Sequence, residues 1–171
     1  MYGGALKIRV MEGTALPIID YIKTNMPTAL ADLRDDRPDN KVSLSPFLDY
    51  FIYPNAIDYR TPALFVLGQN VDFRLSKGQN HINANVRIQL SAVFQDRNAD
   101  FLTYQAWRYH DVLHVLMNRT ELESSDGKIK NIVKVVSSQF GDTIQVKGQT
   151  ESPFRTEVMI LLDVEHYENE N

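Results

Sequence analysis

Apolar and polar residues alternate most regularly between Ile82 and Phe94. The apolar positions are Ile82, Ala84, Val86, Ile88 and Leu90, and the residues between them are Asn83, Asn85, Arg87 and Gln89. Because successive side chains of a strand point to opposite sides of the sheet, this pattern predicts a strand with one buried and one solvated face. Such strands are typical of antiparallel sheets. Residues 156–164 alternate in the same way and predict a second strand of this kind.

Three further apolar segments predict strands. The first covers residues 63–73 and contains Gly68, where we expect a break or a bulge. The others cover residues 132–136 and 143–146. Turns are expected at residues 76–80, at Asp126-Gly127 and at Gly141-Asp142, because Gly, Asp and Asn favour the backbone conformations that turns need.

Two segments carry the 3.6-residue spacing of a helix. Asn98 is expected to cap a long helix that runs to about Arg119. Its apolar stripe consists of Leu102, Ala106, Tyr109, Leu113, Leu116 and Met117. Residues 14–33 predict an N-terminal helix with Thr14 as N-cap and Pro17 in the first turn. We expect Pro27 to kink or break this helix, because proline lacks the N–H that the helix interior requires.

Residues from about 35 to 62 show no clear period and are rich in aromatic side chains. The aromatic residues are Phe47, Tyr50, Phe51, Tyr53 and Tyr59, and prolines interrupt them at 46, 54 and 62. Long loops inside a compact domain are usually functional or mobile, and one with this many rings must bury them against something. Three roles remain open for the segment: packing on the core, a contact with another subunit, or a small-molecule site.

The order of elements is helix, long loop, two strands, helix, and then two or three strands. Such segregation favours the α+β class, with an antiparallel or mixed sheet flanked by an N-terminal helix and one long central helix. We expect one domain over residues 1–171, ending in a frayed acidic tail from about residue 165.

Composition removes several classes of function. The chain contains no cysteine, which excludes disulfides, thiolate nucleophiles and zinc–sulfur sites. No apolar run reaches the length of about 18 residues that a membrane span needs, and residues 1–10 lack the pattern of a signal peptide. The net charge of -4 disfavours tight binding to nucleic acid, because that binding relies on an excess of Lys and Arg.

Beside the aromatic segment, candidate chemistry lies on the central helix. His110 and His114 are four residues apart and share a face, with Asp111 beside them, so the three side chains suggest a small metal- or ligand-binding domain as an alternative function. However, no glutamate occupies the metalloprotease position and no third ligand is implied by the spacing. A surface or interface role, together with Trp107, is the favoured interpretation. No serine has the context of a hydrolase nucleophile and no glycine-rich phosphate loop is present, so we expect neither an enzyme nor a cofactor.

The layout of the chain resembles the tail terminator, or tail completion, proteins of long-tailed bacteriophages. The similarity lies in the short N-terminal helix, the proline-bounded approach to an apolar strand (59–66), the alternating strand (82–94), the helix (98–119) and the closing strand (156–164). The family has no short diagnostic motif, so no functional residue can be transferred. The aromatic segment is longer than in a minimal member, which leaves open whether the chain is a terminator or another neck or tail-tube relative.

The resemblance implies a virion structural protein in the tail or neck, assembled in the host cytoplasm. Family members form a hexameric ring that caps the tail tube, contacts the tube protein and the head connector, and lets DNA pass without specific binding. The free protein is expected either as a ring or as a monomer, with no membrane partner. The candidate subunit-interface residues are Phe47, Tyr50, Phe51, Tyr53, Tyr59, Trp107, His110 and His114.

Overall fold

The structure, a computed structural model, describes residues 9–38, 44–74, 81–148 and 153–169. The helices are α1 (Glu12–Asp36) and α2 (Ala99–Met117). The strands are β1 (Asp49–Phe51), β2 (Ala63–Arg74), β3 (His81–Asp96), β4 (Thr120–Glu123), β5 (Ile129–Phe140), β6 (Ile144–Gln145) and β7 (Phe154–Asn169). The predicted α+β class is confirmed. Neither described helix is both long and apolar enough to cross a membrane.

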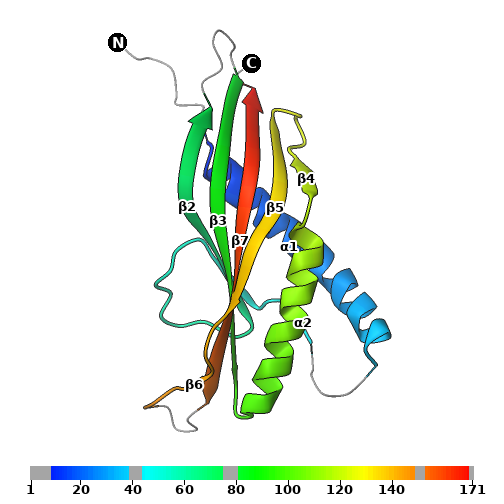
Figure 1. Cartoon of the computed structure of the whole chain (residues 1–171), viewed down its shortest axis with the longest axis vertical. Helices are drawn as coiled ribbons and strands as arrows, with labels where there is room; N and C mark the ends of the chain where they lie inside the picture. Colours follow the sequence, from blue (N-terminus) through cyan, green and yellow to red (C-terminus); the bar gives the residue numbers. More distant parts are fainter. Residues whose placement is uncertain (1–8, 39–43, 75–80, 149–152, 170–171) are drawn as a thin grey trace.

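All the strands belong to one sheet, in the order β1-β2-β3-β7-β5-β4, with β6 also paired to β7. The long strands β2, β3, β7 and β5 pair antiparallel, whereas β1 runs parallel to β2, so the sheet is mixed. The bulge expected near Gly68 is present between Gly68 and Asn70. Figure 1 shows the four long strands side by side, with a strong twist where they cross the middle of the molecule.

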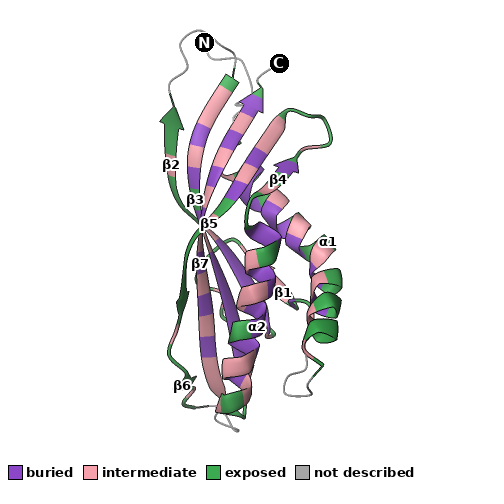
Figure 2. Ribbon diagram, turned by 45° about the vertical axis from the view of Figure 1, so that its right-hand side comes forward, coloured by how far each residue is buried: buried purple, intermediate pink, exposed green. Residues whose placement is uncertain are grey.

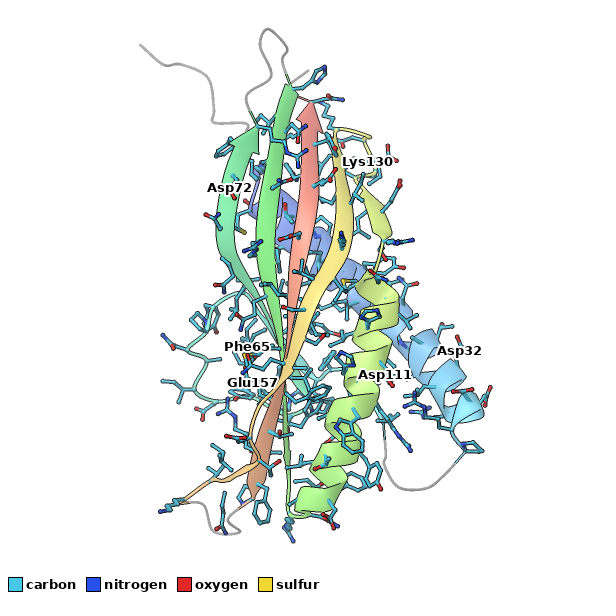
Figure 3. The ribbon with its side chains drawn as sticks, in the orientation of Figure 1. Asp32, Phe65, Asp72, Asp111, Lys130 and Glu157 are labelled. Atoms are coloured by element: carbon cyan, nitrogen blue, oxygen red, sulfur yellow. The ribbon has the colours of Figure 1, made fainter. Side chains whose placement is uncertain are left out.

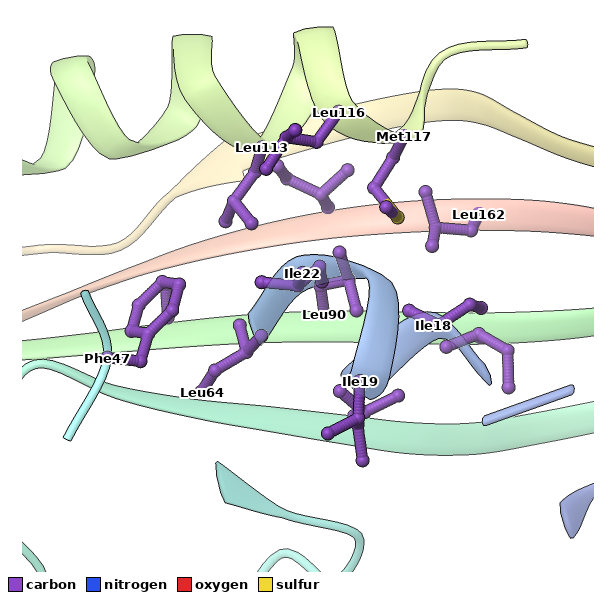
Figure 4. Packing of buried hydrophobic residues seen from close by; sticks show 14 of the residues in the cluster. Ile18, Ile19, Ile22, Phe47, Leu64, Leu90, Leu113, Leu116, Met117 and Leu162 are labelled. Carbon is purple, nitrogen blue, oxygen red and sulfur yellow. The ribbon is translucent and has the colours of Figure 1, made fainter. Parts of the chain in front are cut away.

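One face of the sheet forms the core. Ala84, Val86, Ile88 and Leu90 of β3 are buried, as the alternating pattern predicted, while the residues between them are more accessible. Both helices cover this face (Figure 2). Figure 4 shows how Ile18 and Ile22 of α1 and Leu113 of α2 meet over the strands. We call the opposite side of the sheet the open face.

The helix α1 differs from its prediction in two details, since Pro27 does not break it and its start lies earlier. The helix runs through Pro27 without interruption, and it begins at Glu12 rather than after Thr14. Met26 and Leu30, on either side of Pro27, are buried in the core. Burying each such side chain contributes about 1.5–3 kcal/mol, which offsets the cost of about 3 kcal/mol for an internal proline. Thr14 is buried inside the helix, where its hydroxyl donates to the Val10 carbonyl at 2.6 Å.

The helix α2 begins as predicted, because the side chain of Asn98 accepts hydrogen bonds from the backbone of Asp100 (3.0 Å) and Phe101 (3.3 Å). It ends at Met117, before the left-handed Arg119 (φ 61°), and the short strand β4 follows. Sequence patterns missed β4, and they missed β1 inside the aromatic segment. Residues 165–169 are not a frayed tail, since β7 continues to Asn169. The turn expected at residues 76–80 and the last two residues lie outside the described part of the chain.

Candidate interaction surfaces

The aromatic segment divides into two parts. Phe47 is 5% exposed and packs on the ring of Tyr109, with 5.3 Å between ring centroids, so it is a core residue and not an accessible interface candidate. Tyr50 is half-buried, and burial raises its pKa to about 12. The ammonium group of Lys23 lies 4.8 Å from the centre of the Tyr50 ring. Both rings therefore extend the main core.

The second part, Phe51 to Pro62, crosses to the open face of the sheet. The ring of Phe65 on β2 lies 5.0 Å from Phe51 and 5.4 Å from Tyr59, measured between centroids. Together with Ala63 and Val93 these residues form a small second core. Core packing, one of the three roles left open by the sequence, therefore applies to most of the rings. Tyr53 stays 53% exposed.

An ion pair between Arg60 and Asp49 connects the two ends of this loop. Arg60 donates from Nη2 to the Asp49 carboxylate at 2.7 Å and from its backbone N–H to the same carboxylate at 2.6 Å. The side-chain hydrogen bond from Arg60 lowers the pKa of Asp49. The guanidinium also donates to the Leu48 carbonyl at 3.1 Å. These bonds link the two ends of the loop directly.

A groove of about 1020 Å³ runs between the loop and the open face. Residues 54–60 form one wall, and Phe65, Leu67 and Val93 belong to the sheet side. Arg155, Glu157 and Val146 also line it, from β7 and from the chain just after β6. Figure 3 shows Phe65 and Glu157 close together where the sheet twists. The mixture of rings, amides and charges suits a protein contact more than an enclosed small-molecule site.

His110, Asp111 and Ser138 form a chain of hydrogen bonds between α2 and β5. Nε2 of His110 lies 2.9 Å from the Ser138 hydroxyl, and Nδ1 lies 3.1 Å from the Asp111 carboxylate. The Asp111 carboxylate accepts from Arg37 at 2.7 Å. Burial raises the pKa of Asp111, but hydrogen bonds from Arg37 and His110 outweigh it and the net shift is downward. These contacts fasten the lower part of β5 and the end of α1 to α2.

The same residues do not assemble a metal site. Among the described residues, no group of three or more His, Asp or Glu side chains could hold a metal ion. The ring of His114 lies 6.0 Å from that of His110, and Phe140 covers His110 at 5.1 Å, measured between centroids. Ser138 lies on the helix-covered side of the sheet, away from the groove on the open face. Trp107, at 51% exposed, remains a candidate for contact with another protein.

Two stretches of strand edge lack a strand partner within the described residues. On β2, β1 pairs only with Ala63, Leu64 and Phe65, which leaves residues 66–74 open on that side. On β5, β4 pairs only with residues 130–133, which leaves residues 134–140 open. We call these the β2 free edge and the β5 free edge. Exposed strand edges are templates for pairing with another chain.

The two free edges lie on opposite sides of the sheet and are level with each other over part of their length. Following the register across the sheet, Arg74 is level with Asn83, Tyr167 and Lys130. Residues 66–70 of the β2 free edge are level with residues 138–134 of the β5 free edge, so the two edges overlap. Only residues 71–74 are level with the part of β5 that β4 covers, and only residues 139–140 are level with the part of β2 that β1 covers. Sequence patterns gave no sign of this arrangement, because it depends on how short β1 and β4 are.

A buried polar cluster joins α1 to the sheet. The side chains of His166, Asn131 and Thr14 are fully buried. Nδ1 of His166 lies 2.7 Å from the Asn131 side-chain oxygen, and Nε2 lies 3.3 Å from the Glu168 carboxylate. Burial lowers the pKa of His166, and the nearby Glu168 opposes that shift. The sequence pattern assigned His166 and Glu168 to a frayed tail and so missed this cluster.

No family model matches the sequence, and no curated protein matches it. Among solved structures, one similar chain belongs to the virion of a native gene transfer agent particle. It is 11% identical, and the match covers 68% of this chain and 78% of that chain with a TM-score of 0.30. A TM-score this low carries no argument about fold or function, so the functional argument depends on the geometry of this molecule.

Proposed function

We propose that this protein is a virion structural component that assembles into a ring, caps the tail tube of a long-tailed bacteriophage and joins the tail to the head. The observation that carries the ring is the pair of free edges on opposite sides of one sheet. A ring of identical subunits needs two different surfaces that fit each other, one on each side of the subunit. The β2 free edge and the β5 free edge are two such surfaces.

Strand direction supports pairing between these edges. The strands alternate in direction from β2 through β3 and β7 to β5, so β2 and β5 run in opposite directions. When a second copy follows in the same orientation, its β2 is antiparallel to β5 of the first copy. The alternation then continues through every subunit, and a closed ring leaves no edge of this kind unpaired.

The place of the ring in the virion is supported by the layout of elements that resembles tail terminators. The tail tube protein and the head connector are the partners that this function requires, and DNA passes through the ring. The charges of the open face suit passage without tight binding, because acidic residues pair with basic ones there. Arg87 bonds Asp163 at 3.0 Å, and Lys130 bonds Glu121 at 2.9 Å.

Two experiments test the proposal. Negative-stain imaging of concentrated protein is expected to show rings, most simply of six copies, and Val136→Lys on the β5 free edge is expected to abolish them, because a lysine on an exposed edge opposes strand addition. Val115→Lys, at an exposed position of α2, is the matched control and should keep the rings. Deleting the coding sequence from the source phage should give filled heads without tails and tails of uncontrolled length. Normal virions from that deletion would refute the function.

A further inference from the structure

Apolar side chains remain exposed on the loop that follows β1. Ile57 is 92% exposed, Ile52 58% and Tyr53 53%, and the exposed Asp58 adjoins Ile57. We call these four residues the loop patch. Scattered exposed apolar residues are ordinary, but several on one short loop are typical of a surface that another molecule covers. The loop is also anchored at its base by Asp49 and Arg60, so the patch is held in a defined place.

A second apolar and charged patch lies across the open-face groove from the loop patch, on the β5 side of the sheet. It consists of Ile144 on β6 and of Val146 and Lys147 just after it, and we call it the β6 patch. Ile144 is 56% exposed, and it pairs with Arg155 of β7. Because Arg155 also lines the groove on the open face, Ile144 lies on the same side of the sheet as the loop patch.

The geometry points to a contact between these two patches in neighbouring copies, an inference that rests on the proposed ring. In the edge-paired ring, the β5 free edge of one copy lies along the β2 free edge of the next. β6 pairs with β7 of its own copy just beyond the end of the β5 free edge, so in this ring it lies beside β1 and the loop patch of the next copy. We propose that the β6 patch of each copy packs against the loop patch of its neighbour, with Ile144 against Ile57.

Charge complementarity supports a second copy as the partner. The loop patch carries the acidic Asp58, and the β6 patch carries the basic Lys147. Within the described residues neither side chain takes part in an ion pair, in contrast to Asp49, whose carboxylate Arg60 already binds. In the proposed contact Asp58 faces Lys147 at the edge of the apolar pair. Opposite charges placed this way set the register and the choice of partner.

Disulfide trapping tests the contact directly, because the chain contains no cysteine of its own. The double variant Ile57→Cys/Ile144→Cys is oxidised at the highest soluble concentration and run on a denaturing gel without reductant. A head-to-tail contact gives a ladder of covalent multimers, since each copy then carries two reactive positions. Each single variant can give at most a dimer. Ile57→Cys/Val115→Cys, which pairs the loop with an exposed position of α2, is the matched control and should give no ladder.

Charge exchange provides an independent readout that does not depend on disulfide chemistry. Asp58→Lys alone and Lys147→Glu alone should each weaken association by roughly fivefold to tenfold in sedimentation, because each places like charges together. The double variant Asp58→Lys/Lys147→Glu should recover most of the loss. Both positions are exposed, so these variants should keep the melting temperature of the wild type.

The outcomes separate this inference from the proposed function. Rings that form and respond to Val136→Lys, but give no ladder and no charge-exchange recovery, would overturn the contact and leave the ring intact. A ladder with recovery establishes the contact. If the wild-type protein associates neither in solution at any concentration nor at the end of a purified tail tube, both the proposed ring and the proposed contact are refuted.

Discussion

The side-chain amide of Asn131 donates a hydrogen bond of 2.9 Å to the backbone oxygen of Gly13. In a regular helix that oxygen accepts from the residue four positions later, which here is Pro17 and has no N–H to give. Asn131 on β5 therefore supplies the donor that the sequence of α1 lacks. The bond is buried, and through the side-chain oxygen of Asn131 it is continuous with His166.

Replacing Asn131 with alanine should lower the free energy of unfolding by about 2–3 kcal/mol. The change leaves the Gly13 oxygen without a donor and leaves Nδ1 of His166 with only the Thr14 hydroxyl, 3.2 Å away. An unsatisfied buried polar group costs about 1–3 kcal/mol. Urea denaturation measures the difference. Asn70→Ala is the control, because its amide bonds Asp72 at the surface, and it should change stability by less than about 0.5 kcal/mol. Equal effects of the two substitutions would contradict the role assigned to Asn131.

The two prolines of α1 should respond differently to alanine. Pro27→Ala restores a helical donor at an exposed position and should raise the free energy of unfolding by about 1–3 kcal/mol. Pro17→Ala should give little or no gain, because the new N–H would compete with Asn131 for the Gly13 oxygen. Thermal melts of the two variants measure the two changes in stability. A larger gain in stability for Pro17→Ala than for Pro27→Ala would contradict the role of Asn131 as the donor to Gly13.

Acidification should destabilise the protein through His166. Burial is the main cause that holds the pKa of His166 below its usual value of about 6.5, against the opposing influence of Glu168. Below about pH 6.5 the unfolded chain binds a proton at this histidine, while the folded protein does so only at lower pH. Stability therefore falls as the pH decreases through that window. Denaturant titrations between about pH 5 and 7.5 should show a shallower decline for His166→Gln. An unchanged decline would exclude His166 as its source.

The two faces of β3 should differ sharply in their tolerance of a carboxylate. Ile88 is fully buried beneath the helices, so Ile88→Asp should cost more than about 4 kcal/mol and unfold the domain. Gln89 borders the groove on the open face, and Gln89→Asp should cost less than about 1 kcal/mol. Circular dichroism melts provide the comparison. Similar melting temperatures would mean that the faces have been assigned the wrong way round.

Chelation should leave the melting temperature unchanged. His110 and His114 supply two nitrogens, Phe140 covers one ring, and Ser138 occupies Nε2 of His110. Two ligands without a third give a site too weak to contribute to folding. The measurement is a thermal melt with and without EDTA, followed by added zinc. A drop of several degrees that zinc reverses would support the metal-binding alternative.

The sequence by itself determined the α+β class, the alternation of β3 and β7, the Asn98 cap and the bulge near Gly68. Each of these depends on the chemistry of a few neighbouring residues, because strand and helix periods, capping and glycine conformations are local. The buried set of β3 could be named from the sequence for the same reason.

Only the tertiary structure decided that α1 continues through its prolines, that residues 165–169 extend β7, and that Phe47 belongs to the core. In each case contacts with residues far along the chain override the local preference: burial of Met26 and Leu30, the partners of His166, and the ring of Tyr109. The free edges are decided in the same way. The length of each free edge depends on where β1 and β4 end along β2 and β5. The sequences of β2 and β5 alone cannot predict those end points.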